Sequence, residues 1–297
     1  MPFTPFHLGP ALAFGTPFSK RIHLPTFLIA NVYIDLEPLI MVTILRLNYP
    51  LHGYLHTFLF AGLAGLGLGY LTYLLDGFLN PVWKTFKLID ANTQYGLKEH
   101  FIAGVSGSIL HVAFDAPLYS DIMPFYPCME NPLYELLSNS QCFGSSVIFI
   151  YELTILLGVY GLALYLKNAL GPLTLLVINS LIYLFLGCSL FLASLPSNGF
   201  LTLALSIVSY ITTFFHIVAY VYKRKDKHNA LRYLRMLLSI LAIFLGGSLI
   251  SIQLISTEAD LCLKIINTTK ATVFVAIVAL LHLHALKTYI SVHESSV

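Results

Sequence analysis

Long apolar segments constrain this chain more than any other feature. They recur along its 297 residues, and each is long enough to cross the roughly 30 Å hydrocarbon core of a bilayer as a helix. We expect helices near residues 24–45, 53–75, 101–119, 147–166, 173–195, 200–222, 231–255 and 271–290, with a short or re-entrant one near 7–18. The sequence therefore predicts an all-α, polytopic helical membrane protein with about eight or nine membrane helices.

Composition supports this class and excludes others. Hydrophobic residues make up 57% of the chain and charged residues only 10%, whereas about a quarter of a soluble protein is charged. The formal net charge of +2 is too small to indicate a nucleic-acid partner. We expect a multi-pass integral membrane protein that does not bind nucleic acid.

One basic segment predicts the orientation. Residues 222–235, YKRKDKHNALRYLR, carry six Lys and Arg between two apolar runs. By the positive-inside rule the 223–227 loop is cytoplasmic. Counting helices back from it puts residues 120–146 on the outer side of the membrane.

The composition changes near residue 145. Polar residues interrupt the apolar runs before it, and plain spans with small residues follow it. We interpret residues 1–145 as a membrane-embedded metal-site module and residues 146–297 as a C-terminal transmembrane helical bundle. Cys128 and Cys142 are near enough in sequence for a loop-closing disulfide, which the sequence leaves open.

Ionisable groups inside membrane segments are costly and are therefore candidates for function. Those of the first part are His7, Asp35, Glu37, His52, His56, His111 and Asp115. His52 and His56 are four residues apart, as are His111 and Asp115, so in a helix each pair projects from one face. Imidazole and carboxylate are the common ligands of zinc and related divalent metals. The pattern predicts a metal site.

Asp35 and Glu37 need a break in their helix to join such a site. They are two residues apart, roughly 200° around a regular helix. Pro38 disfavours helical angles at Glu37, so we expect a break there that turns both carboxylates inward. With the predicted orientation, every candidate lies in the outer half of the membrane or at its surface. We expect one or two divalent ions there, with zinc favoured and manganese or magnesium as alternatives.

Histidines in membrane segments can also have roles other than metal binding. A single intramembrane histidine is more often a packing residue than a ligand, and we interpret His216, His282 and His284 in that way. Bis-histidine haem ligation would not need Asp35, Glu37 and Asp115.

The ordered motifs resemble those of the YdjM-type membrane-bound metal-dependent hydrolases, over about residues 1–127. They are Pro2-Phe3-Thr4-x-x-His7, Asp35-x-Glu37, His52-x-x-x-His56 and His111-x-x-x-Asp115. The chain departs from the family at Ile34 (usually Pro), Glu37 (Asp), Gly53 (Arg), Thr57 (Ser) and Leu110 (Ser). Glu37 keeps the carboxylate and Thr57 keeps the hydroxyl of the family motif. Gly53 lacks the guanidinium of the Arg, and this loss would change recognition of an anionic substrate.

The resemblance and the residues together predict a membrane-embedded, metal-dependent hydrolase. We expect it to act on an ester, and a phosphoester of a membrane lipid or lipid-linked substrate suits the site depth best. Asp35 and Glu37 are the candidate catalytic carboxylates, Glu37 as bridging ligand or general base. Two alternatives are a divalent-metal transporter that uses the same ligands and a non-enzymatic membrane scaffold that docks partners on residues 222–235.

Overall fold

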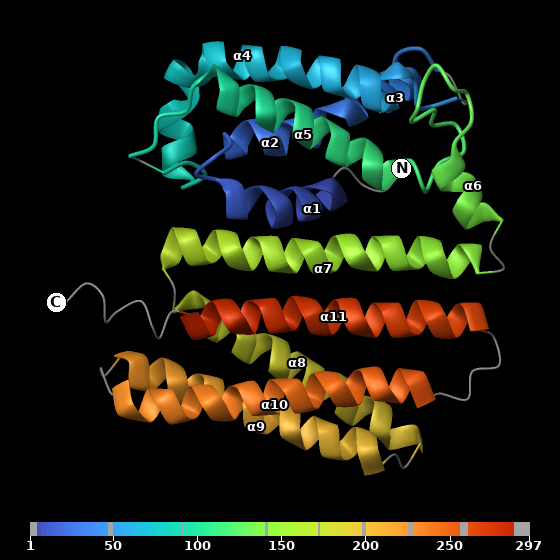
Figure 1. Cartoon of the computed structure of the whole chain (residues 1–297). Coiled ribbons are helices and arrows are strands. Elements are labelled where there is room, and N and C mark those ends of the chain that lie inside the picture. Colours follow the sequence, from blue (N-terminus) through green and yellow to red (C-terminus); the bar gives the residue numbers. More distant parts are fainter. Residues whose placement is uncertain are drawn as a thin grey trace. The chain divides into compact units, whose positions relative to one another are not determined.

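In the computed structural model, every element of the described part of the chain is a helix (Figure 1). The structure describes residues 5–46, 50–90, 92–139, 142–171, 173–197, 200–224, 228–255 and 261–287. The chain divides into two compact units, Met1–Tyr165 and Leu166–Val297.

The first unit contains a closely packed antiparallel helix pair (Figure 1). The helices of this unit are α1 (Pro5–Gly15), α2 (Leu24–Ala30), α3 (Leu36–Thr43), α4 (Phe58–Thr85), α5 (Leu97–Asp115), α6 (Pro132–Ser138) and most of α7 (Phe143–Leu170), with 3-10 turns at Thr16–Phe18, Tyr33–Asp35 and Tyr54–His56. In the pair α4–α5, a Cβ added at Gly65 or Gly104 would meet the backbone of the opposite helix. Glycine therefore permits the close approach that holds the pair together.

Close contact between α7 and α1 explains where the units divide. Gly9 of α1 lies against Gly158 of α7, and Gly161 of α7 lies against the backbone of α1 at Leu12 and Ala13. Because α7 packs with α1, most of α7 belongs to the first compact unit, which ends at Tyr165. The sequence pattern identifies the helix but does not show which neighbour it contacts.

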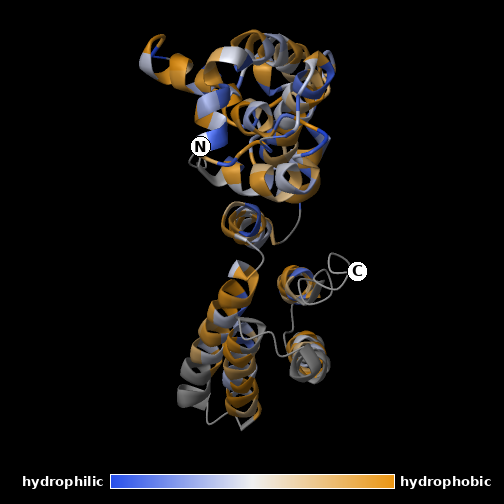
Figure 2. Ribbon diagram, turned by 90° about the vertical axis from the view of Figure 1, so that its left-hand side faces the viewer, coloured by the Kyte–Doolittle hydropathy of each residue, from blue (hydrophilic) through white to orange (hydrophobic). Residues whose placement is uncertain are grey.

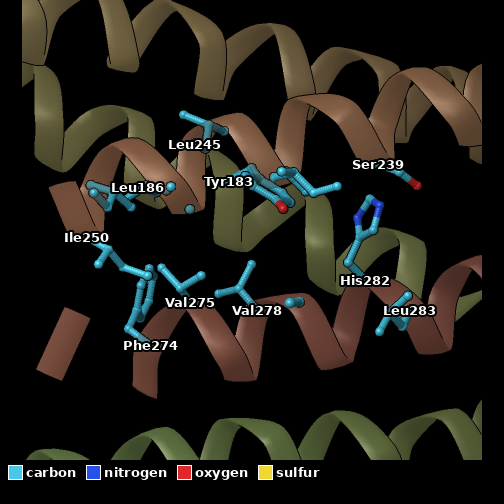
Figure 3. A pocket seen from close by; sticks show the side chains of 16 residues that line it. Tyr183, Leu186, Ser239, Leu245, Ile250, Phe274, Val275, Val278, His282 and Leu283 are labelled. Carbon is cyan, nitrogen blue, oxygen red and sulfur yellow. The ribbon is translucent and has the colours of Figure 1, made fainter. Parts of the chain in front are cut away.

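The second unit contains the helices α8 (Thr174–Ser197), α9 (Phe200–Arg224), α10 (His228–Ile255) and α11 (Leu261–Lys287). Its core brings together Tyr183, Leu205, Leu245 and Val278. A cavity of about 500 Å³ lies between α8, α10 and α11, and most of its lining is apolar. Figure 3 shows Ser239 and His282 near each other on one side of this cavity.

Within the described residues, five helical segments are long and apolar enough to cross a membrane. They are Leu24–Thr43, Phe58–Thr85, Phe143–Leu170, Leu201–Val221 and Leu261–Ala285. Hydrophobic residues recur along the helices of both units (Figure 2), and large ones such as Phe78 and Phe185 are exposed. These are the features of a helical membrane protein.

The five segments are fewer than the eight or nine helices expected. Helix α1 has only 11 residues, and α5 begins with charged residues. The apolar stretches of α8 and α10 within the described residues, Thr174–Leu190 and Leu237–Ile250, are shorter than a span. Of the predicted cytoplasmic loop 223–227, residues 225–227 lie outside the described part of the chain.

Candidate metal centre

His111 and Asp115 lie one turn apart on α5, at the end of the helix. His111 Nε2 is 3.3 Å from Asp115 Oδ2, and both side chains are buried. On the other side of the ring, His111 Nδ1 is 2.8 Å from the carbonyl oxygen of Asn31. The helical period therefore places this pair as the sequence predicts.

The helix that carries Asp35 and Glu37 breaks, but earlier than expected. Helix α2 ends at Ala30, a 3-10 turn covers Tyr33–Asp35, and α3 begins at Leu36. Pro38 falls in the first turn of α3, where a missing N–H costs nothing. Asp35 Oδ1 then lies 3.6 Å from His111 Nε2, whereas Glu37 points toward His56.

His52 and His56 do not share a helical face, because α4 begins only at Phe58. His52 lies in the preceding loop and His56 ends the 3-10 turn Tyr54–His56. Their rings still meet edge to face, with centroids 4.6 Å apart. The loop and the 3-10 turn therefore bring the two rings together, as we expected a helix to do.

Each of these two rings contacts a carboxylate through its Nδ1 atom. Glu37 Oε2 is 2.9 Å from His56 Nδ1, and Glu37 also accepts hydrogen bonds from the N–H groups of Gly53 and Leu55. A Cβ at Gly53 would meet the Glu37 carboxylate, so a larger residue there would displace this carboxylate from its present position.

Asp121 supports His52 in the same way. Its Oδ1 lies 2.9 Å from His52 Nδ1, and its Oδ2 accepts hydrogen bonds from the N–H groups of Leu51 and His52. Burial alone would raise the pKa of the Asp121 carboxyl, but the hydrogen bonds and the charge interaction with His52 hold it below its ordinary value.

His7 reaches the cluster from α1. Its Nε2 is 3.3 Å from Asp115 Oδ1, and its ring stacks on that of His111 with centroids 4.1 Å apart. Four segments distant in sequence therefore contribute to one buried centre.

Asp115 is shared between two sets of ligands. One set is His7, Asp35, His111 and Asp115, and the other is His52, His56 and Asp115. Within each set the candidate ligand atoms lie within 4.8 Å of one another. A carboxylate common to two sets suits a pair of adjacent ions. Glu37 belongs to neither set and lies behind His56.

The hydrogen bonds of the rings fix where their lone pairs point. His56 and His111 each direct Nδ1 at an oxygen that only accepts, a carboxylate and a carbonyl respectively. Their Nδ1 atoms therefore carry hydrogen, and in the neutral rings Nε2 carries a lone pair. The two Nε2 atoms are 3.4 Å apart. Two facing lone pairs require either a proton or a cation between them.

Other polar atoms of the cluster also need a proton or a cation nearby. His7 Nε2, Asp35 Oδ2 and both Asp115 oxygens are buried without a hydrogen-bond partner. Histidine is the partner in every ion pair of this cluster. Buried carboxylates are costly unless a cation neutralises them, so the donor set fits divalent ions.

Sequence reasoning missed Asp121 and Asn31. Asp121 lies in a connecting segment outside the motifs, and only its position six residues after Asp115 offered a signal. Asn31 contributes a backbone carbonyl, and its side chain donates to the Gly107 carbonyl, so its residue type gave no indication of the contact with His111. Among the described residues, which include all four cysteines, no disulfide forms.

Comparisons of the chain with protein-family models, curated proteins and solved structures found no match.

Proposed function

We propose that this chain is a membrane-embedded, metal-dependent hydrolase that acts on an ester, with a lipid phosphoester as the favoured substrate. The facing Nε2 atoms of His56 and His111, beside the shared Asp115 carboxylate, carry the proposal. The resemblance to the YdjM-type hydrolases supports it. A divalent ion held by this set would supply Lewis acidity toward the ester and toward water.

The residues of the chain divide into ligands and supports. His7, His52, His56, His111, Asp35 and Asp115 direct side-chain atoms at the centre. Glu37 and Asp121 accept hydrogen bonds from the outer nitrogens of His56 and His52, which fixes the orientation of both rings and raises their basicity.

Asp35 is the better candidate for a general base. Both oxygens of Glu37 already accept hydrogen bonds, whereas Asp35 Oδ2 has no partner. A carboxylate with an uncommitted oxygen beside the ligands can take a proton from the attacking water. We therefore assign Asp35 to proton transfer and Glu37 to positioning.

The surroundings of the site favour a lipid. Helix α3, which begins directly after Asp35, exposes large apolar residues along its length, including Leu36, Leu39 and Ile40. In a bilayer such a surface contacts acyl chains, so a lipid headgroup can reach the carboxylates without leaving the membrane.

The proposal includes the predicted topology. We propose that α5, α8 and α10 cross the membrane together with the five long apolar segments, and that the 223–227 loop is cytoplasmic. The metal centre then lies toward the outer face.

Metal analysis and a substrate panel test the function. Protein purified in detergent should contain zinc, or manganese or magnesium, and should hydrolyse members of a phospholipid and phosphoester panel. Chelator should abolish hydrolysis and Asp35→Asn should reduce it, whereas Glu130→Gln, an exposed carboxylate of the 120–131 segment, should not.

The alternatives predict other outcomes. Metal uptake into proteoliposomes without hydrolysis would indicate a transporter. Full stability in chelator, with no metal and no hydrolysis, would indicate a scaffold.

A further inference from the structure

A second group of potential ligands lies in the first unit, outside the centre described above. It consists of His23 before α2, Asp76 in α4 and His100 in the first turns of α5. Their candidate ligand atoms lie within 4.8 Å of one another. The sequence motifs include none of the three.

His100 presents a fixed lone pair. Its Nδ1 is 2.9 Å from the carbonyl oxygen of Gly96, which only accepts, so Nδ1 carries the hydrogen. Its Nε2 is buried and has no hydrogen-bond partner.

His23 is oriented by a chain of hydroxyl groups. The Thr26 hydroxyl donates to Thr72 Oγ1, and the Thr72 hydroxyl donates to the Gly69 carbonyl. With both hydroxyl hydrogens committed in this way, hydrogen on Nδ1 accounts for the 2.7 Å contact between His23 Nδ1 and Thr26 Oγ1. The Thr26 N–H also points at Nδ1, but at 3.4 Å it is the weaker contact. In this tautomer His23 Nε2 carries a lone pair.

These lone pairs face a carboxylate. His23 Nε2 lies 3.3 Å from Asp76 Oδ1, and neither atom has a hydrogen-bond partner. The His23 and His100 rings stack with centroids 4.0 Å apart. Both histidines are about 1% exposed or less, and Asp76 is 17% exposed. Buried acceptors that face one another without a donor need a cation.

We propose that His23 Nε2, His100 Nε2 and Asp76 Oδ1 form a second, independent site for one divalent transition-metal ion. Two imidazoles and one carboxylate suit Zn²⁺ with an open fourth position, and also Fe²⁺. Calcium and magnesium prefer oxygen ligands and fit less well.

The second site cannot share an ion with the first. His100 and His111 are separated by roughly 16 Å along α5, at 1.5 Å per residue, whereas ligand bonds are about 2 Å. The ion would tie the start of α2 to the later part of α4 and to the start of α5. The close approach of Gly69 to the His100 backbone already brings α4 and α5 together there.

Cobalt binding tests the second site without reference to hydrolysis. The full chain is stripped with chelator, equilibrated with Co²⁺ alone and analysed for bound metal and for visible absorption. His23→Gln, His100→Gln and Asp76→Asn should each lose one equivalent of Co²⁺ relative to the unmodified chain. Metal analysis of protein as purified distinguishes Zn²⁺ from Fe²⁺.

A matched control and a background variant complete the experiment. His216→Gln removes a buried histidine whose Nδ1 is likewise tied to a carbonyl, that of Thr212, but that belongs to no group with a carboxylate among the described residues. It should leave the cobalt content unchanged. Asp115→Asn should retain the equivalent held by the second site, so failure of the hydrolase proposal is distinguishable from failure of this one.

Because Asp76 is partly exposed, its substitution should disturb folding less than substitution of either buried histidine. Asp76→Asn keeps the shape of the side chain, and its elution on size exclusion should match that of the unmodified chain. Unchanged cobalt content in folded Asp76→Asn, or loss of all cobalt in Asp115→Asn, would overturn the proposal.

Discussion

His7 and Asp115 meet although more than a hundred residues separate them: Nε2 of His7 lies 3.3 Å from Oδ1 of Asp115. Asp115 also faces His111 and His56, so a single carboxylate contacts three imidazoles. With neutral imidazoles, such a cluster has too few hydrogens to satisfy its nitrogens and oxygens. The Asp115 charge is therefore the most informative group to remove.

We predict that Asp115→Asn removes the metal of the first centre and abolishes hydrolysis while the protein remains in the membrane. If the ion is present at 100 times its Kd, it contributes about 2.7 kcal/mol to stability, which the variant loses. Thermal melts with and without chelator measure this. Chelator should lower the melting temperature of the unmodified chain more than that of the variant.

If these residues serve only for packing, the stability change caused by Asp115→Asn should have the opposite sign. A carboxylate buried without a cation is costly, so Asn would then be neutral or stabilising. The metal centre would be ruled out if chelator did not change the melting temperature of the unmodified chain and the variant had a higher melting temperature.

The sequence identified the candidate ligand residues but not the groups that contact them from outside. Helical spacing correctly related His111 to Asp115, because both lie on the regular helix α5. The same rule was wrong for His52 and His56, since the chain is not helical before Phe58 and loop geometry has no fixed period. Proline chemistry indicated a break near Asp35 but not its position.

Contacts between segments that are distant in the sequence could not be predicted from it. Asp121 is an ordinary loop carboxylate until the fold brings it to His52. His23, Asp76 and His100 come from three segments and share no spacing rule. A single sequence contains local periodicity but not pairing between distant positions.

The outer carboxylates provide the next prediction. Asp121→Asn and Glu37→Gln should each weaken metal binding about 10- to 100-fold, because each removes the charge that orients and polarises a ligand histidine. Competition against a chromophoric chelator measures the affinity. Glu130→Gln is the matched control and should bind normally; equal weakening there would show a general charge effect.

Acid stability should report on Asp121 separately. Its folded pKa lies below the ordinary value of 3.8, so its contribution to stability is complete above that pH and is lost as the pH falls through the folded pKa. Unfolding of the chelated protein should therefore become more similar for the unmodified chain and Asp121→Asn as the pH is lowered. A difference that grows toward acid would contradict the assignment.

Glycine packing in the pair α4–α5 is testable with matched residues on one helix. A Cβ at Gly65 would meet the Gly104 carbonyl and Ser108 Oγ, whereas nothing lies within 4 Å of one at Gly67. Gly65→Ala should cost about 1–3 kcal/mol through overpacking, and Gly67→Ala should be neutral or slightly stabilising. Thermal melts compare them. Equal effects would show that the helices do not approach as closely as described.

The orientation of the membrane helices provides the last prediction. Six Lys and Arg in residues 222–235 outweigh the cations of every other connection, so the positive-inside rule favours a cytoplasmic side for this segment. Lys225→Cys and Glu130→Cys, each made in a chain whose four native cysteines are replaced, provide one reporter for each predicted side. An impermeant thiol reagent applied to intact cells should label position 130 and not position 225, and permeabilised cells should be labelled at both. The opposite pattern would place the metal centre on the cytoplasmic side and exclude lipids of the outer leaflet as substrates. Labelling at both positions in intact cells would show that segments 120–146 and 222–235 lie on one side, which requires a different number of crossings between them.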